Sequence, residues 1–277
     1  MRLTGNVHTT DYLRLIGVRE MPPLTSPLDS GYDATTLESH LDQSSHLMAA
    51  LKISTACLML ASETATRRKI AAAKSYNVPT IVGSEPFGIA LAQNRLPVYL
   101  DLCADMRFTR IECARVLSGR PLNASEVVKM AEARGLEVEF EVEKKDPGIL
   151  TSDALEQLIA EGKQWLDAGA LELVVEASDR GKGCDLLDLG GERNFRDAIA
   201  DRLVKEFGLT VMIFKTATNV SQYGLLDHFG PQVRLSDVRL EDLLSVEIYR
   251  RGLRCEGLAS EKSPTNWHAA ATESMSR

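Results

Sequence analysis

Residues 151–178, TSDALEQLIAEGKQWLDAGALELVVEAS, decide the fold class because they contain one complete helix-to-strand unit. Thr151, Ser152 and Asp153 offer side-chain acceptors to the free amides at a helix N-terminus. Apolar residues then recur at helical spacing up to Gly169, and glycine is a common left-handed stop after a helix. The apolar run over 171–178 predicts a strand. This stretch therefore predicts a helix over 154–168 with a strand directly after it.

The same alternation of short strands and longer helical patterns continues along the chain, as in parallel βαβ units. The predicted strands are residues 24–29, 46–54, 78–84, 108–114, 137–143, 171–178, 210–216 and 233–237. They recur mostly every 25 to 35 residues or so, roughly the length of one βα unit. Eight such strands close a barrel. The sequence therefore predicts a single (β/α)8 TIM barrel over 24–256, an N-terminal extension over 1–23 and a flexible C-terminal tail over 257–277.

Composition narrows the class of protein. The chain has 277 residues, is 44% hydrophobic and carries a net charge of −7, which disfavours nucleic acid as a partner. The five cysteines are scattered without the spacing of a zinc site or of a disulfide framework. The N-terminus lacks the apolar core of a signal peptide, and apolar runs are too short to cross a membrane. We expect a cytoplasmic protein that binds neither nucleic acid nor membrane.

Polar residues gather at the predicted carboxyl ends of the strands, where barrel enzymes place their catalytic groups. In chain order they are Asp29, Lys52, Ser84, Glu112, Glu141 with Lys144, Glu176, Lys215 and Asp237. Several carboxylates and lysines at one end of a barrel favour metal-assisted acid–base chemistry. Mg²⁺ is the expected metal because it prefers oxygen ligands and retains water. The alternative is a structural salt bridge, for example between Glu112 or Glu176 and Lys52.

A second polar group follows the last predicted strand, in the stretch YRRGLR over 249–254. Barrels commonly bind phosphate near the loops after strands seven and eight, and guanidinium groups bond two phosphate oxygens at once. Arg250 and Arg254 are therefore candidate phosphate ligands. For Arg251 we favour the alternative, that it complements the negative end of a helix dipole.

Several motifs, in the order in which they occur, resemble the phosphosulfolactate synthase family. They are Asp29-Ser30-Gly31, Glu141-Val142-Glu143-Lys144-Lys145-Asp146, Asp167-Ala168-Gly169-Ala170 with Val174-Val175-Glu176-Ala177, Phe229-Gly230-Pro231, and Glu247 with Arg250-Arg251-Gly252-Leu253-Arg254. The resemblance runs from the first predicted strand to the last helix. It implies a magnesium-dependent barrel that adds sulfite to phosphoenolpyruvate.

The resemblance also implies roles for individual residues. Lys144 is expected to be the proton donor, and Glu112, Glu141 or Glu176 to lie near the metal. The resulting assignment is catalysis by Lys144, Lys52 and Glu112, substrate or phosphate binding by Arg250, Arg254, Ser236 and Lys215, and Mg²⁺ binding by Glu141, Glu176 and Asp29. The implied partner is a small anionic substrate similar to phosphoenolpyruvate, and a homo-oligomer is expected.

Departures from the family pattern leave alternatives open. Cys113-Ala114-Arg115 replaces a serine and an aspartate of the family's pattern, and Lys215 stands where the family has glutamate. Changed charges in a pocket change which anion it binds. The substrate or nucleophile could therefore differ, or the barrel could be an inactive binding or stress-associated protein. A third alternative is an aldolase-type enzyme in which Lys52 or Lys215 forms a Schiff base.

Overall fold

The computed structural model describes residues 8–114, 123–142, 151–178, 187–188 and 198–253, and its strands form a closed ring. The strands are β1 (Thr25–Asp29), β2 (Leu51–Ile53), β3 (Thr80–Val82), β4 (Arg110–Ala114), β5 (Glu137–Val142), β6 (Glu172–Ser178), β7 (Leu187–Asp188), β8 (Met212–Lys215) and β9 (Leu235–Arg239). All pairings between them are parallel. The sheet runs β5-β4-β3-β2-β1-β9-β8-β6, and a further β5–β6 pairing closes it into an eight-stranded barrel.

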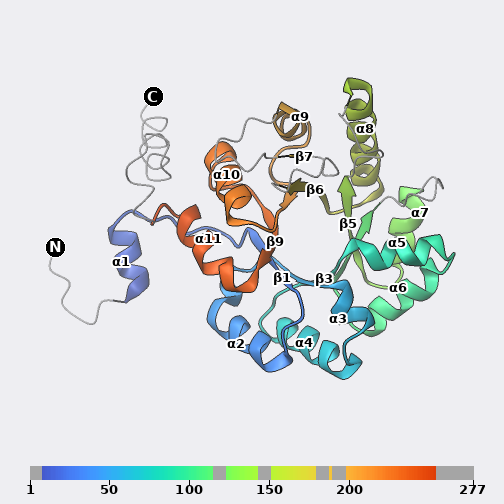
Figure 1. Cartoon of the computed structure of the whole chain (residues 1–277), viewed down its shortest axis with the longest axis horizontal. Helices are drawn as coiled ribbons and strands as arrows, with labels where there is room; N and C mark the ends of the chain where they lie inside the picture. The colour runs from blue at the N-terminus through green and yellow to red at the C-terminus, as the bar shows by residue number, and fades with distance from the viewer. Residues whose placement is uncertain (1–7, 115–122, 143–150, 179–186, 189–197, 254–277) are drawn as a thin grey trace.

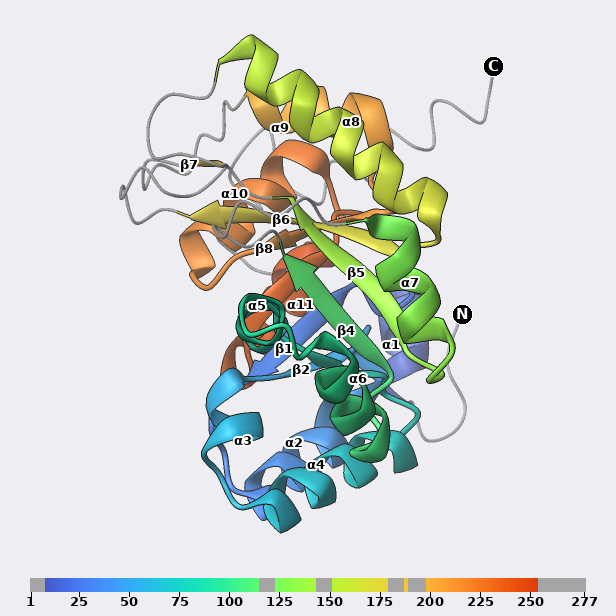
Figure 2. The same cartoon turned by 90° about the vertical axis from the view of Figure 1, so that its right-hand side faces the viewer.

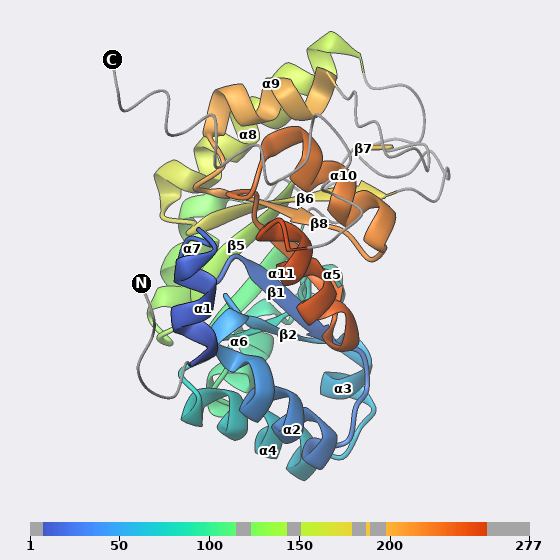
Figure 3. The same cartoon turned by 90° about the vertical axis from the view of Figure 1, so that its left-hand side faces the viewer.

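Helices surround this ring on the outside (Figure 1). They are α1 (Thr9–Leu15), α2 (Ala34–Ser44), α3 (Thr55–Met59), α4 (Glu63–Ser75), α5 (Ser84–Ala92), α6 (Leu96–Asp105), α7 (Ala124–Glu132), α8 (Ser152–Ala168), α9 (Ala198–Phe207), α10 (Asn219–Phe229) and α11 (Leu243–Arg250), with short 3₁₀ turns at Ser45–Leu47 and Leu240–Asp242. Figure 2 shows β4 and β5 side by side within α6, α7 and α8, and Figure 3 shows α1 outside the barrel.

The prediction of a (β/α)8 TIM barrel is confirmed. Each of the eight predicted strands is present. Seven have shorter bounds than predicted, and β9 lies two residues later in the chain. α8 ends at Gly169 with φ 109°, the left-handed stop expected from the sequence. The strand predicted over 46–54 is β2 alone, because the residues before it turn through a 3₁₀ helix. The short β7, which pairs with the end of β6, was not predicted. Among the described residues, no helix is long and apolar enough to span a membrane.

Alternation along the strands separates an apolar outer face from a charged inner face. Phe140 of β5 stacks on Trp165 of α8 with ring centroids 4.3 Å apart, and Phe214 of β8 stacks on Phe229 of α10 at 5.4 Å. The residues on either side of Phe140, Glu139 and Glu141, therefore face the barrel interior. Charged side chains inside the barrel must be paired, because burial removes their hydration. The ion pairs among these inward-facing side chains define the candidate site.

Candidate active site

Lys52 of β2 lies inside the barrel between two carboxylates from other strands. Its Nζ is 2.7 Å from Oε2 of Glu112 on β4 and 2.9 Å from Oδ1 of Asp237 on β9. The Lys52 and Glu112 side chains are 5% and 2% exposed, so this pair is shielded from water. Three strands far apart in the sequence thus meet at one ammonium group.

Lys215, at the end of β8, continues the same group of charges. Its Nζ is 2.6 Å from Oε1 of Glu141 and 4.0 Å from Oε1 of Glu112. Ser84, which begins α5, donates a hydrogen bond of 2.7 Å to the other oxygen of Glu141. We call Lys52, Lys215, Glu112, Glu141 and Asp237 the lysine–carboxylate cluster.

Asp237 reaches this cluster because β9 contains a bulge. The register with β1 shifts at this point, so that Ser236 pairs with Ser26 but Val238 pairs with Pro27. Asp237 is the extra residue, and its φ of 60° lies in the left-handed region that aspartate tolerates better than most residues. Bulges of this kind turn a side chain that strict alternation would direct elsewhere.

The carboxylates keep both lysines charged. Burial alone would lower the pKa of Lys52, but Asp237 and Glu112 outweigh it and raise that pKa above its usual value. Burial likewise opposes the charge on Lys215, while Glu112 and Glu141 raise its pKa. Schiff-base formation needs a neutral amine, so this arrangement disfavours the aldolase-type alternative.

Two buried polar atoms of this region lack a hydrogen-bond partner among the described residues. They are Oε1 of Glu112 and Oγ of Ser236. Ser236 is the register partner of Lys215 across β8 and β9, so its side chain lies on the same inner face of the barrel. Buried polar atoms without partners are uncommon and mark places where a ligand or water is accommodated.

The sequence analysis gave no role to Glu85, yet the structure brings it to the cluster. Thr55 donates a hydrogen bond of 2.8 Å to Oε2 of Glu85. Partial burial opposes the charge on Glu85, but the bond from Thr55, a backbone amide and the charges of Lys215 and Lys52 together lower its pKa. A Cβ atom at Gly83 would lie 3.3 Å from Oε2 of Glu85 and 3.4 Å from Cε of Lys52, so these side chains share a confined space. Glu85 directly follows the strand predicted over 78–84, and this position was the available signal.

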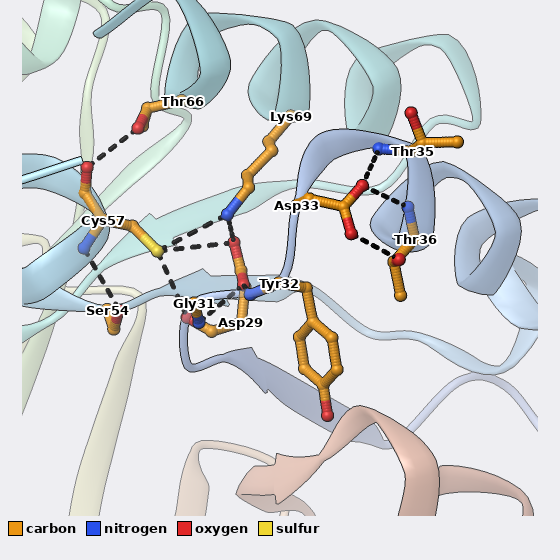
Figure 4. A network of polar contacts seen from close by, with 10 residues as sticks. All are labelled: Asp29, Gly31, Tyr32, Asp33, Thr35, Thr36, Ser54, Cys57, Thr66 and Lys69. Atoms are coloured by element: carbon orange, nitrogen blue, oxygen red, sulfur yellow. Dashed lines mark hydrogen bonds and ion pairs between the residues drawn. The ribbon is translucent and has the colours of Figure 1, made fainter. Parts of the chain in front are cut away.

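Asp29 lies at the end of β1 but does not face the cluster. Its neighbour Leu28 pairs with Lys52, so strand alternation directs Asp29 to the outer face. There Oδ2 accepts a bond of 2.7 Å from Lys69, and Oδ1 accepts the amides of Gly31 and Tyr32 (Figure 4). A role for Asp29 as a ligand of a metal at the cluster does not fit this placement.

Arg250 lies at the opposite end of the barrel. Its guanidinium donates to Glu247, to the carbonyls of Pro231 and Val233, and to Thr25, the first residue of β1. Pro231 and Val233 precede β9, so these contacts are at the N-terminal ends of the strands. Phosphate binding by Arg250 at the cluster therefore does not fit. Lys144 and Arg254 lie outside the described residues.

The remaining predicted metal ligands do not form a complete protein site. Both oxygens of Glu141 are engaged by Lys215 and Ser84, and Glu176 is the partly exposed register partner of Lys215. Within the described part of the chain, no group of three or more His, Cys, Asp and Glu side chains is placed to hold a metal. Mg²⁺, however, often uses only one or two carboxylates together with substrate oxygens, and Oε1 of Glu112 is an unused acceptor.

Comparison with known protein families identifies the family of this barrel. Residues 22–256 match the family of (2R)-phospho-3-sulfolactate synthase. The chain belongs to this family. Phosphosulfolactate synthase of Methanocaldococcus jannaschii is 25% identical over 232 residues, which cover 83% of this chain and 92% of that protein. The enzyme of the same name from Bacillus subtilis is 22% identical over 233 residues, covering 83% and 89%.

Similarity to solved structures supports the fold of this phosphosulfolactate synthase family member. The 3-dehydroquinate dehydratase from Geobacillus kaustophilus aligns with a TM-score of 0.50 and 14% identity, covering 83% of this chain and 91% of that one. At this identity the similarity concerns the barrel alone. Family membership supports a lyase-type enzyme with a small anionic substrate. The lysine–carboxylate cluster contains the ionisable side chains that could take part in such a reaction.

Proposed function

We propose that this chain adds sulfite, or a related anionic nucleophile, to phosphoenolpyruvate or a similar anionic enol, with the reaction at the lysine–carboxylate cluster. The observation that carries the proposal is the pair of ammonium groups, the buried Lys52 and the half-buried Lys215, on either side of the Glu112 carboxylate. Oε1 of that carboxylate accepts no hydrogen bond among the described residues. Such ammonium groups stabilise an oxyanion when they are positioned before the reaction begins.

The chemistry follows from where charge develops. Sulfite attacks the methylene carbon, and electrons move onto the substrate carboxylate. Lys215 and Lys52 stabilise that charge through N–H donors held in place by Glu141 and Asp237. A proton then reaches C2, and Lys144 is the donor in this proposal. Ser236, beside Lys215, donates to an oxygen of the bound substrate.

Charge balance supports a requirement for Mg²⁺. Within the cluster three carboxylates face two cations, and Glu85 and Glu176 add further carboxylates nearby. Negative charge is therefore in excess before an anionic substrate enters. Glu112 and Glu176 are the residues proposed to hold the ion. When bound, Mg²⁺ polarises substrate oxygens as a Lewis acid.

The direct experiment is to incubate the purified protein with phosphoenolpyruvate, sulfite and Mg²⁺ and to detect the sulfite adduct by mass spectrometry. Samples without metal and with Lys144→Ala run in parallel. The proposal expects an adduct that requires both the metal and Lys144. If no adduct forms while Mg²⁺ still binds, the barrel acts on another anionic substrate; if neither occurs, the inactive alternative gains support.

A further inference from the structure

A second group of buried reactive side chains lies outside the barrel, between β1, α3 and α4. Nζ of Lys69 on α4 is 3.5 Å from Sγ of Cys57 on α3 and 2.7 Å from Oδ2 of Asp29 (Figure 4). The same carboxylate oxygen is 3.7 Å from the thiol. Cys57 and Lys69 are only 2% and 3% exposed, and Asp29 is fully buried. A thiol, an ammonium and a carboxylate therefore share one enclosed space.

The backbone holds the thiol in this position. The amide of Cys57 donates to Oγ of Ser54 at the start of α3, and Thr66 of α4 donates a bond of 2.8 Å to the carbonyl of Cys57. Lys69 is fixed by its ion pair with Asp29. Because the backbone of Cys57 and the ammonium of Lys69 are both held, the approach of nitrogen and sulfur is built into the fold.

We infer that Cys57 and Lys69 form a covalent nitrogen–oxygen–sulfur bridge when the protein reacts with dioxygen. The thiol loses its proton and the ammonium loses two, while one oxygen atom joins nitrogen to sulfur. Dioxygen accepts two electrons from the sulfur and two from the nitrogen, and its second oxygen leaves as water. Water takes two of the three protons, and Asp29 accepts the third at Oδ2. The bridged lysine is uncharged, and the protonated Asp29 is also neutral, so no unpaired charge is left buried.

The distance favours an oxygen bridge over a direct sulfur–nitrogen bond. A direct bond would require the two atoms to come much closer than 3.5 Å, and packed interiors resist such shifts. An inserted oxygen spans most of the existing separation. Burial also excludes bulkier oxidants and other thiols, whereas dioxygen is small and apolar. Burial thereby protects the bridge from thiols that reverse cysteine oxidation.

The bridge would link α3 covalently to α4 close to the cluster. Thr55, two residues before Cys57, donates the hydrogen bond that holds Glu85 beside Lys52 and Lys215. Oxidation would therefore fix the segment that carries this contact. The inference does not depend on the reaction proposed above, since the covalent product is detected directly.

The test uses the full-length protein, reduced with a phosphine, freed of reductant and divided between anaerobic and oxygen-saturated buffer. In the oxygenated sample, peptide mass spectrometry is expected to show the peptides of Cys57 and Lys69 joined. Their combined mass should rise by one oxygen and fall by two hydrogens, and trypsin should no longer cleave after Lys69. Reduction after denaturation, which exposes the bridge, should restore both peptides.

Variants supply matched controls. Cys57→Ser and Lys69→Arg should abolish the joined peptide, whereas Cys103→Ser should leave it, since Cys103 is equally buried but contacts Tyr99. The wild-type result stands even if a variant fails to fold. The inference is overturned if Cys57 remains a thiol after exposure to oxygen, if it is oxidised without being joined to Lys69, or if the joined peptides lack the added oxygen.

Discussion

Both ends of the barrel bury ion pairs, but they build them from different cations. At the N-terminal end, Arg110 contacts Glu137 at 2.7 Å and Glu139 at 3.1 Å, and Arg250 is bonded to Glu247 and to backbone carbonyls. At the C-terminal end the cations are Lys52 and Lys215.

The arginine pairs are suited to stabilising the fold, whereas the lysines are suited to binding a substrate. The planar fork of arginine fixes several acceptors at once, whereas the ammonium of lysine is a point charge that can redirect its donors to a ligand. All three guanidinium nitrogens of Arg250 already donate hydrogen bonds and its side chain is fully buried, so it has little capacity for a substrate. The side chain of Lys215, at the other end, is 17% exposed. We therefore expect mutations at the two ends to have different effects.

The largest effect is expected from Arg250→Met, on stability. The substitution removes the buried ion-pair partner of Glu247, which keeps only Thr25 and Arg251, and takes a donor from two carbonyls. This loss should lower the free energy of unfolding by about 3–5 kcal/mol. Urea denaturation measures this loss. Activity per folded molecule should stay near the wild-type value, and a large fall in kcat without loss of stability would instead place Arg250 in the reaction.

Lys215→Gln should lower activity and leave stability nearly unchanged, the opposite of Arg250→Met. Loss of one positioned cation at a developing oxyanion lowers kcat by about 10²–10³-fold. Sulfite-dependent consumption of phosphoenolpyruvate measures it, and circular dichroism checks the fold. Lys163→Gln is the matched control, because Lys163 forms an ion pair with Glu206 on the outer helices and should leave kcat unchanged. Equal losses in both variants would contradict the role of the cluster.

Glu139 links the two ends and predicts a pH dependence of stability. Burial, then Glu172 and Glu112, raise its pKa from 4.5 to about 8, with Arg110 opposing. The folded protein therefore holds a proton that the unfolded chain releases, so this stabilisation is complete below about pH 4.5 and is lost as the pH rises to 8. The slope contributed is at most about 1.4 kcal/mol per pH unit.

The Glu139→Gln variant cannot titrate at this position and should lack that slope. Thermal or urea unfolding between pH 5 and 9 or so compares the two proteins. The stability of the variant relative to wild type should rise with pH. Parallel curves for the two proteins would mean that Glu139 is ionised in the folded state.

The smallest effect is expected from Glu85→Gln. Removing a partly exposed negative charge near Lys52 and Lys215 should strengthen binding of an anionic substrate, lowering KM by about two- to fivefold. The change should shrink as salt is added, because ions screen exposed charges. A raised KM would mean that Glu85 contacts the substrate directly.

Much of the fold could be predicted from sequence because each βα unit carries its own signals, such as the caps of α8 and the stop at Gly169. Placement of Lys52, Glu112 and Lys215 together also followed from their positions near strand ends. Which partners they have could not be predicted, since barrel closure decides which strands face each other. The bulge that turns Asp237 inward is equally a property of register.

Two predicted roles do not fit the positions of their residues. Asp29 faces outward because Leu28 pairs with Lys52, a register that only the structure shows. A helix that follows a barrel strand runs back toward the strand's N-terminal end, so Arg250 at the end of α11 had to lie far from the cluster. To predict which residues lie at the cluster, the direction in which a helix or strand runs was therefore more informative than closeness in sequence to a strand end.

Binding of phosphoenolpyruvate tests the central claim, that the substrate site is at the lysine–carboxylate cluster. Isothermal titration calorimetry in the presence of Mg²⁺ would compare wild type with Lys215→Gln and Arg250→Met, each confirmed to be folded. We predict that binding is lost or strongly weakened in Lys215→Gln and close to wild type in Arg250→Met. Normal affinity in Lys215→Gln with loss of binding in Arg250→Met would contradict the account.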